Sequence, residues 1–278
     1  MFPAGFFYEI NPTYKKNDLL KSCIIPLRLL TLQNKVLLSM QFSFLSAPAQ
    51  NLPPLRIEET SGRGRFGAST KALACLTAVG IIMATGRGLL TANWWFFVML
   101  SWNVFLAWFP LGVQLVIRDL IQNRVVGRVG VWAGLGLWLL FMPNAPYIIT
   151  DLFHIQSLSA PLLWFDTLMI FLFAMTGLLA GLYSSYLAHN LFDQLVGRWN
   201  AWGLMAVCQI LAGFGIYLGR WGRWNSWHLM SKPWLLGQAV WQSAHDHLAI
   251  KLTGVYGLVL LGIYVAFWLF VRDEKKAV

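Results

Sequence analysis

Long apolar stretches separated by short polar segments fill the chain from about residue 72 onward. A transmembrane helix needs about 20 mainly apolar residues. Six stretches reach or approach that length: 72–90, 92–117, 129–149, 161–187, 199–218 and 252–271. The pattern therefore predicts an all-α fold, a polytopic membrane helical bundle of about six transmembrane helices.

Residues 1–70 have a different character, because they mix Pro, Ser, Asn and charged residues. Their one apolar run, at 36–47, is too short to span a bilayer. We expect residues 1–70 to form a poorly ordered N-terminal extension, and Met40 is an alternative start of translation. Residues 71–272 are expected to form the six-helix transmembrane domain, with an interfacial segment at 220–250 on its outer side.

Composition supports a membrane location, since 58% of the residues are hydrophobic and only 12% are charged. Soluble domains carry about 25% charged residues, so a disordered chain, a coiled coil and an ordinary soluble enzyme are excluded. The formal net charge of +10 would suggest nucleic acid in a soluble protein. Here the basic residues fall mostly beside apolar spans, so the expected partner is the lipid bilayer and not nucleic acid.

The distribution of Lys and Arg predicts the orientation, because cytoplasmic loops are enriched in these residues. With the N-terminus in the cytoplasm, the inner segments hold more Lys and Arg than the outer ones, even without residues 1–70. An even number of spans then places both termini in the cytoplasm. We expect a multi-pass protein of a bacterial inner or plasma membrane.

The third span contains two prolines, Pro143 and Pro146. Each lacks a backbone N–H and restricts the residue before it, so regular helix should fail near Met142. From residue 129 to that point the helix rises only about 21 Å, against about 30 Å of hydrocarbon. We therefore predict a third helix that is broken at Pro143–Pro146, with its opened turn lining an outward cavity. The alternative is that the prolines merely cap a helix that starts near Arg124.

With this topology the polar residues of several distant segments meet at the outer face. They come from the loop after the third span, the start of the fourth span and the loop after the fifth. The candidate outer-face polar cluster consists of Asn144, Tyr147, Thr150, Asp151, His154, Asp166, Arg220, Arg223, Asn225, Trp227 and His228. Spacing gives little support for a metal site, and a site from Asp151, His154 and His228 is a minor alternative. The sequence indicates no cofactor, catalytic residue or oligomeric state.

Asp166 has two interpretations, because a charge near the membrane is costly unless it is paired or wet. It is either an interfacial carboxylate in the headgroup layer or the buried partner of Arg220 or Arg223. Arginine suits that pairing because its guanidinium binds a carboxylate bidentately.

The arginines and tryptophans after the fifth span also have two interpretations. Arg220 and Arg223 are three residues apart, as are Trp221, Trp224 and Trp227, which on a helix places each set along one face. One interpretation is an aromatic belt with snorkelling arginines; the other is an anion clamp walled by indole rings. The following segment, 233–250, is amphipathic and is expected either to lie in the interface or to cover the cavity.

Four strings in this order resemble a family of bacterial integral membrane proteins: P-N-A-P-Y-x-x-T-D, W-F-D, G-L-x-x-G and G-R-W-x-R-W-N-S-W. The family is catalogued as domain of unknown function thirteen sixty-one, and the resemblance covers about residues 72–271. It implies an all-helical multi-pass protein but no activity, and it offers no catalytic residues. Its motif positions coincide with the candidate outer-face cluster.

Two functional hypotheses remain open. In the first, the outer site of a binding, assembly or transport protein holds an anionic headgroup, an anionic lipid or lipid-linked ligand, or a partner. In the second, a membrane-embedded enzyme acts on a lipid or lipid-linked substrate, with Asp151, Asp166 and His228 as acid–base groups and Arg220 and Arg223 stabilising an anion. An enzyme needs its acid or base beside the pocket, whereas a transporter needs the cavity to continue inward.

Overall fold

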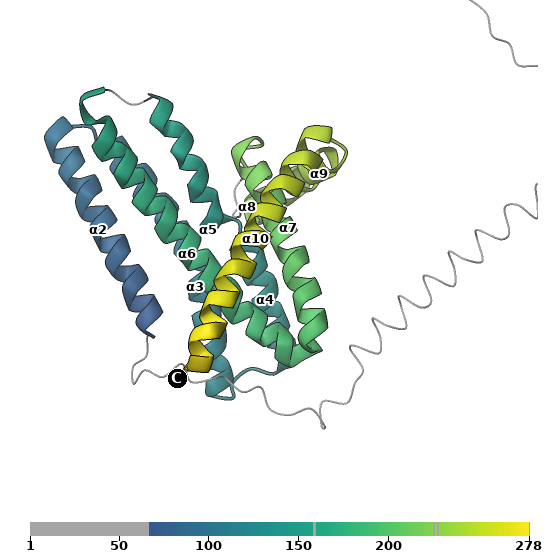
Figure 1. Cartoon of the computed structure of the whole chain (residues 1–278). Helices are drawn as coiled ribbons and strands as arrows, with labels where there is room; N and C mark the ends of the chain where they lie inside the picture. Colours follow the sequence, from purple (N-terminus) through teal and green to yellow (C-terminus); the bar gives the residue numbers. More distant parts are fainter. Residues whose placement is uncertain (1–66, 158–159, 225, 227, 278) are drawn as a thin grey trace, which may run out of the picture. The chain divides into compact units, whose positions relative to one another are not determined.

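The computed structural model describes residues 67–157, 160–224, 226 and 228–277, and this part of the chain is helical without a strand (Figure 1). Six segments are long and apolar enough to cross a membrane, so the predicted six-helix bundle is confirmed. They are α2 (Ala68–Thr91), α3 (Trp95–Gln122), a third span over Arg128–Phe153, α6 (Leu163–Val196), α7 (Arg198–Arg220) and α10 (His247–Ala277). The predicted extension lies outside the described residues up to residue 66.

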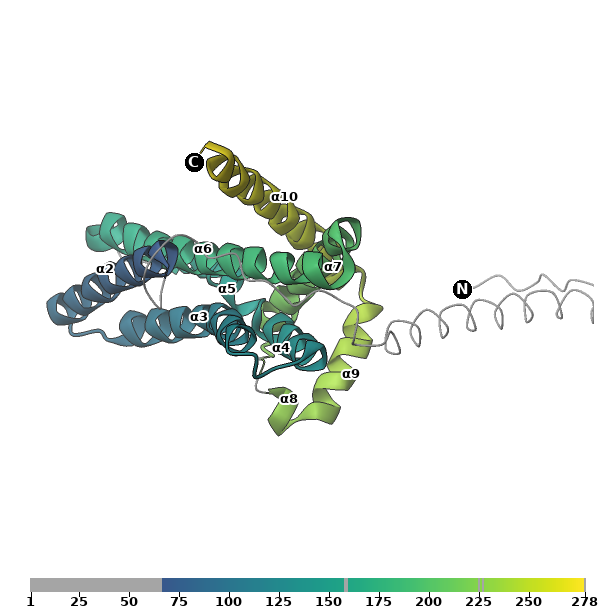
Figure 2. The same ribbon diagram turned by 90° about the horizontal axis from the view of Figure 1, so that it is seen from below.

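Helix α6 is the centre of the bundle, since it packs against α2, α3, α7 and α10 (Figure 2). It continues nine residues past the predicted end at residue 187 and stops at Gly197, whose φ of 82° is left-handed. Glycine adopts that conformation without strain, which is why it ends many helices. The extra turns place the polar residue His189 inside the protein.

The third span is interrupted where the prolines predict it. Helix α4 (Arg128–Phe141) ends after 14 residues, a four-residue helix α5 (Asn144–Tyr147) follows, and a 3-10 segment η1 (Ile148–Ser157) completes the span. The first helix begins at Arg128 and not at Arg124, so the prolines do not simply cap a full-length helix. Its rise is about 21 Å, short of a full hydrocarbon crossing of about 30 Å.

Beyond α4 the chain turns toward α6, and glycines allow that approach. A Cβ on Gly181 of α6 would lie 2.9 Å from the Cβ of Ala145, and one on Gly177 would overlap Ile148. On the other side, a Cβ on Gly215 of α7 would lie 2.5 Å from Cγ of Pro143. The interrupted segment is therefore packed between α6 and α7, at helix positions where only glycine fits.

Helix α7 ends at Arg220, and the next residues do not continue it. Arg223 has a left-handed φ of 53°, and the Trp224 N–H donates to the Leu218 carbonyl six residues earlier. The helical spacing predicted for the arginines and tryptophans here is therefore wrong, because the chain reverses before a second turn forms. Two short helices follow, α8 (His228–Ser231) and α9 (Pro233–Ala244), on the side of α4 that faces away from α6 (Figure 2).

Candidate functional site

A cavity of about 440 Å³ lies beyond the end of α4, between α3 and α7. It lies beside the interrupted part of the third span, where the chain after α4 packs against Gly177 and Gly181 of α6. The lining residues are Met99, Trp102, Asn103, Leu106, Leu139, Leu140, Pro143, Asn144, Tyr147, Asp151, Leu211, Phe214, Gly215, Leu218, Gly219, Arg220, Trp224, Ser226 and Leu236. Most are apolar, and the polar ones come from α3, α5, η1, α7 and the loop after α7.

Asp151 in η1 is the buried acid of this cavity, with 2% of its surface exposed. Its Oδ2 accepts a hydrogen bond of 2.6 Å from Nδ2 of Asn103 on α3. A buried carboxylate requires such donors, because unpaired burial of a charge is costly. The neighbouring Thr150 is equally buried, and its hydroxyl donates to the Tyr147 carbonyl at 2.7 Å. Thr150 therefore shapes the turn and does not reach the cavity.

Ser226 joins the loop after α7 to the interrupted span. Its hydroxyl accepts from Nδ2 of Asn144 at 3.2 Å and donates to the Leu140 carbonyl at 3.3 Å. The end of α4 exposes carbonyl groups that have no partner within the helix. The serine satisfies one of them and fixes this loop as a wall of the cavity.

Arg220 is the cationic group of the cavity. It is half-buried at the last position of α7, and its guanidinium carbon lies 5.4 Å from the centre of the Phe153 ring. Among the described residues, no carboxylate lies within ion-pair distance of Arg220. A guanidinium carries five N–H donors, so this one retains donors for a bound anion.

Asp166 does not belong to this cavity. It is fully buried on α6 and forms a bidentate ion pair with Arg87 of α2, through Nε–Oδ1 at 2.7 Å and Nη2–Oδ2 at 3.0 Å. The pairing with Arg220 or Arg223 is therefore wrong, and so is the interfacial interpretation. Because α2 and α6 are antiparallel, Arg87 near the end of α2 and Asp166 near the start of α6 lie at one level. The Arg87 guanidinium also lies 4.3 Å from the ring centre of Phe96, which belongs to an apolar cluster with Leu100 and Ile148.

The other predicted residues are dispersed or lie outside the described part. Arg223 is exposed and does not line the cavity. His228 also lies outside the lining, with its ring 5.3 Å from that of Trp224 in an edge-on arrangement. Asn225, Trp227 and the side chain of His154 are not among the described residues. In the described part of the chain, no group of three His, Cys, Asp or Glu side chains is placed to hold a metal ion.

The sequence did not identify three functional groups that the structure adds. Asn103 and Arg87 are polar residues within apolar spans, which is itself a signal, because such residues in transmembrane helices need partners. Their positions within the spans place Asn103 at the same end of the bundle as the loop after the third span, and Arg87 at the same end as Asp166. Ser226 gave no such signal, since a serine in a loop has many roles.

These features define the class of the protein, a six-helix multi-pass membrane protein with a cavity at one end of the bundle. The family model described as "Protein of unknown function (DUF1361)" matches residues 102–268, more than half of the chain. The chain belongs to that family, as the order of its motifs predicts. No curated protein and no solved structure is significantly similar to the chain.

Proposed function

We propose that the cavity binds an anionic group of a membrane-associated ligand, and that Arg220 is its main contact. The observation that carries the proposal is a half-buried guanidinium in a largely apolar cavity without a carboxylate at ion-pair distance. Hydrogen bonds to charged groups are worth about 1.5–3 kcal/mol, and an apolar wall strengthens them by excluding water. Asn144, Tyr147 and Ser226 add neutral polar groups around the anion.

The shape of the cavity favours binding over conduction. Its lining comes from the first half of α3, the last turn of α4 and the second half of α7, which all lie at one end of the bundle. Below it, Leu135, Trp138 and Met205 are fully or almost fully buried. Polar side chains at that depth are buried, with hydrogen bonds from Trp138 Nε1 to Ser184 and from Gln209 to Ser185, and none of these residues lines the cavity. A transporter needs its cavity to continue inward.

We further propose that this end of the bundle faces away from the cytoplasm. Its described basic residues are Arg87, Arg220, Arg223, Lys232 and Lys251, and Arg87 is neutralised by Asp166. The opposite end carries Lys71, Arg118, Arg124, Arg128, Arg198 and Arg272. The larger number of Lys and Arg residues at that end supports a cytoplasmic position for it.

The test is binding of dioleoyl phosphatidylglycerol to the purified full chain, measured by native mass spectrometry. Arg220→Gln should weaken binding about 10- to 100-fold, the value of one charge-assisted contact. Lys251→Gln is the matched control. Lys251 is exposed on α10, so this substitution removes the same charge outside the cavity. Equal affinities of the two variants would refute the role of Arg220.

One observation favours the enzymatic alternative, namely that the Asp151 carboxylate and the Arg220 guanidinium line the same cavity. Such a pair provides a proton-transfer group beside an anion-stabilising group. Neither Asp166 nor His228 serves this role here, since neither lines the cavity. Incubation with the same lipid should then give a product of changed mass with the wild type and none with Asp151→Asn; a product formed equally by both would exclude Asp151.

A further inference from the structure

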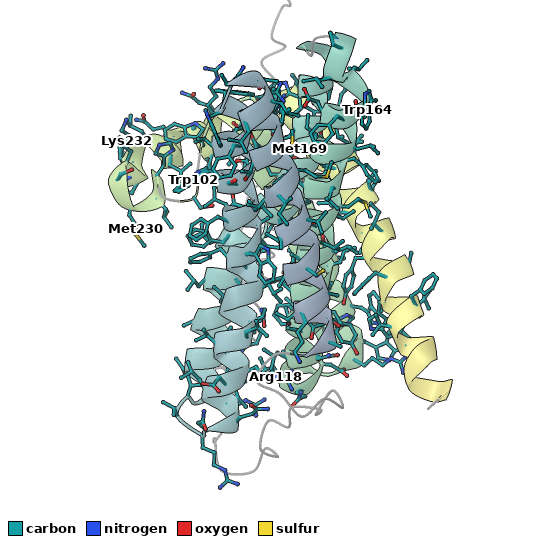
Figure 3. The ribbon with its side chains drawn as sticks, turned by 90° about the vertical axis from the view of Figure 1, so that its left-hand side faces the viewer. Trp102, Arg118, Trp164, Met169, Met230 and Lys232 are labelled. Carbon is teal, nitrogen blue, oxygen red and sulfur yellow. The ribbon has the colours of Figure 1, made fainter. Side chains whose placement is uncertain are left out.

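The cavity lies against the lipid-facing side of the bundle. Trp102 of α3 and Leu211 of α7 line it, and they are 52% and 45% exposed. In a bilayer these exposed surfaces contact acyl chains and not water. Figure 3 shows Trp102 beside the α8–α9 segment with Met230 and Lys232, at the end of the bundle opposite Arg118.

The apolar wall of the cavity continues along α4 toward the surrounding lipid. Leu140 lines the cavity, and Leu137 lies three residues earlier, where the α-helical repeat brings the two side chains onto one side. Leu137 is 42% exposed. A ligand with an apolar chain can therefore leave the cavity along this side of α4 without crossing a polar rim.

Helix α9 indicates how deep the opening lies in the bilayer. Its half-buried residues Leu236, Ala239 and Ser243 share the side that faces the bundle. On the opposite side, Trp234 and Trp241 are 77% and 70% exposed. Tryptophan is enriched at membrane–water interfaces, so this surface fits the headgroup layer.

The length of α4 gives the depth of the cavity floor. A helix that rises about 21 Å in about 30 Å of hydrocarbon ends about 9 Å below the far surface. Interfacial helices bury their apolar faces to a similar depth, about 5–10 Å. The floor of the cavity therefore lies about 9 Å inside the hydrocarbon, at the level of the acyl chains and below the headgroup layer.

From these observations we infer that the ligand is an anionic membrane lipid that enters sideways from the leaflet, between α3 and α7 and below α9. Its charged headgroup lies against Arg220, and its chains follow Leu140 and Leu137 back into the bilayer. The inference rests on the proposed function, because it assigns a source to the anion at Arg220. A cavity of about 440 Å³ is within the range of small-molecule sites, about 300–1,000 Å³, and suffices for a headgroup with the first part of its chains.

The experiment compares two probes on the purified full chain by native mass spectrometry: dioleoyl phosphatidylglycerol and its chain-free analogue glycerophosphoglycerol. The lipid should bind at least about 100-fold more tightly, the effect of roughly four buried methylene groups. Leu140→Gln should weaken lipid binding about 10-fold by placing an amide in the path of the chains. Leu258→Gln is the control, because Leu258 is 67% exposed on α10 and does not line the cavity, and it should have no effect.

Each result distinguishes this inference from the proposed function. If both probes bind equally and both lose affinity in Arg220→Gln, the site takes a soluble anion, and lateral entry is overturned while the anion site stands. If Leu140→Gln and Leu258→Gln give the same lipid affinity, the route along α4 is overturned. If neither probe depends on Arg220, the proposed function itself fails.

Discussion

Replacing Arg87 by methionine removes the partner of the buried Asp166 carboxylate, and the structure gives the expected cost. Two charge-assisted hydrogen bonds, at 2.7 and 3.0 Å, are lost, and each is worth about 1.5–3 kcal/mol. Removal of one partner of a buried pair costs about 3–5 kcal/mol by itself. We expect a loss near 4 kcal/mol, which lowers the folding equilibrium constant about a thousand-fold.

The measurement is unfolding of the purified chain in mixed micelles, followed by tryptophan fluorescence. Arg87→Met should shift the midpoint strongly toward lower denaturing-detergent fractions. The double variant Arg87→Met, Asp166→Leu should recover most of the loss, because two apolar side chains of similar volume replace a buried ion pair with little or no penalty. Lys251→Met should stay within about 0.5 kcal/mol, as is usual for exposed positions.

A double variant as unstable as the sum of the two single variants would refute this expectation. That outcome would mean that the two residues act independently and that the cost comes from lost packing. A loss below about 1 kcal/mol in Arg87→Met would also refute it, since the Asp166 carboxylate would then have to be solvated.

Two further predictions concern the interrupted span and the start of α10. Gly215→Ala should destabilise the fold by about 1–3 kcal/mol, because its Cβ would lie 2.5 Å from Cγ of Pro143 and force a shift. Gly136→Ala in α4, with open space around it, should instead be neutral or stabilising by up to about 1 kcal/mol. Equal losses of stability in both variants would contradict the close packing of Gly215 against Pro143. The second prediction rests on a pKa: a hydrogen bond from the Leu248 backbone N–H holds the pKa of the Asp246 carboxyl below its usual range. A depressed folded pKa gives stability that is present above the ordinary carboxyl pKa and lost as the pH falls through the folded value. Asp246→Ala should therefore weaken hydrogen-exchange protection of the first α10 turn at neutral pH and match the wild type near pH 2, and a difference that persists there would refute this role.

The sequence predicts the spans and the interruption well, because both follow from strong local rules. Apolar length defines a transmembrane helix, and two prolines three residues apart stop regular helix wherever they stand. The end of α6 was predicted less well. Residues 188–196 are more polar than the span before them, so the apolar stretch ends before residue 188. The helix itself continues to the left-handed Gly197.

Topology alone predicts only part of the site. Topology brings Asp151 and Arg220 to one end of the bundle, and both line the cavity. It does not determine which side of a helix a residue occupies, and Asp166 faces α2 instead. The helical spacing assumed for Arg223 failed for a local reason, because the backbone reverses after α7.

The ion pair between α2 and α6 also limits how far the chain can be shortened without leaving a buried charge unpaired. The family-matched region begins at residue 102, after Arg87 and before Asp166. A fragment cut at that boundary would keep all the lining residues from Trp102 onward yet leave a bare carboxylate against lipid. Truncation work on this protein therefore has to retain α2, even though that helix contributes nothing to the cavity lining.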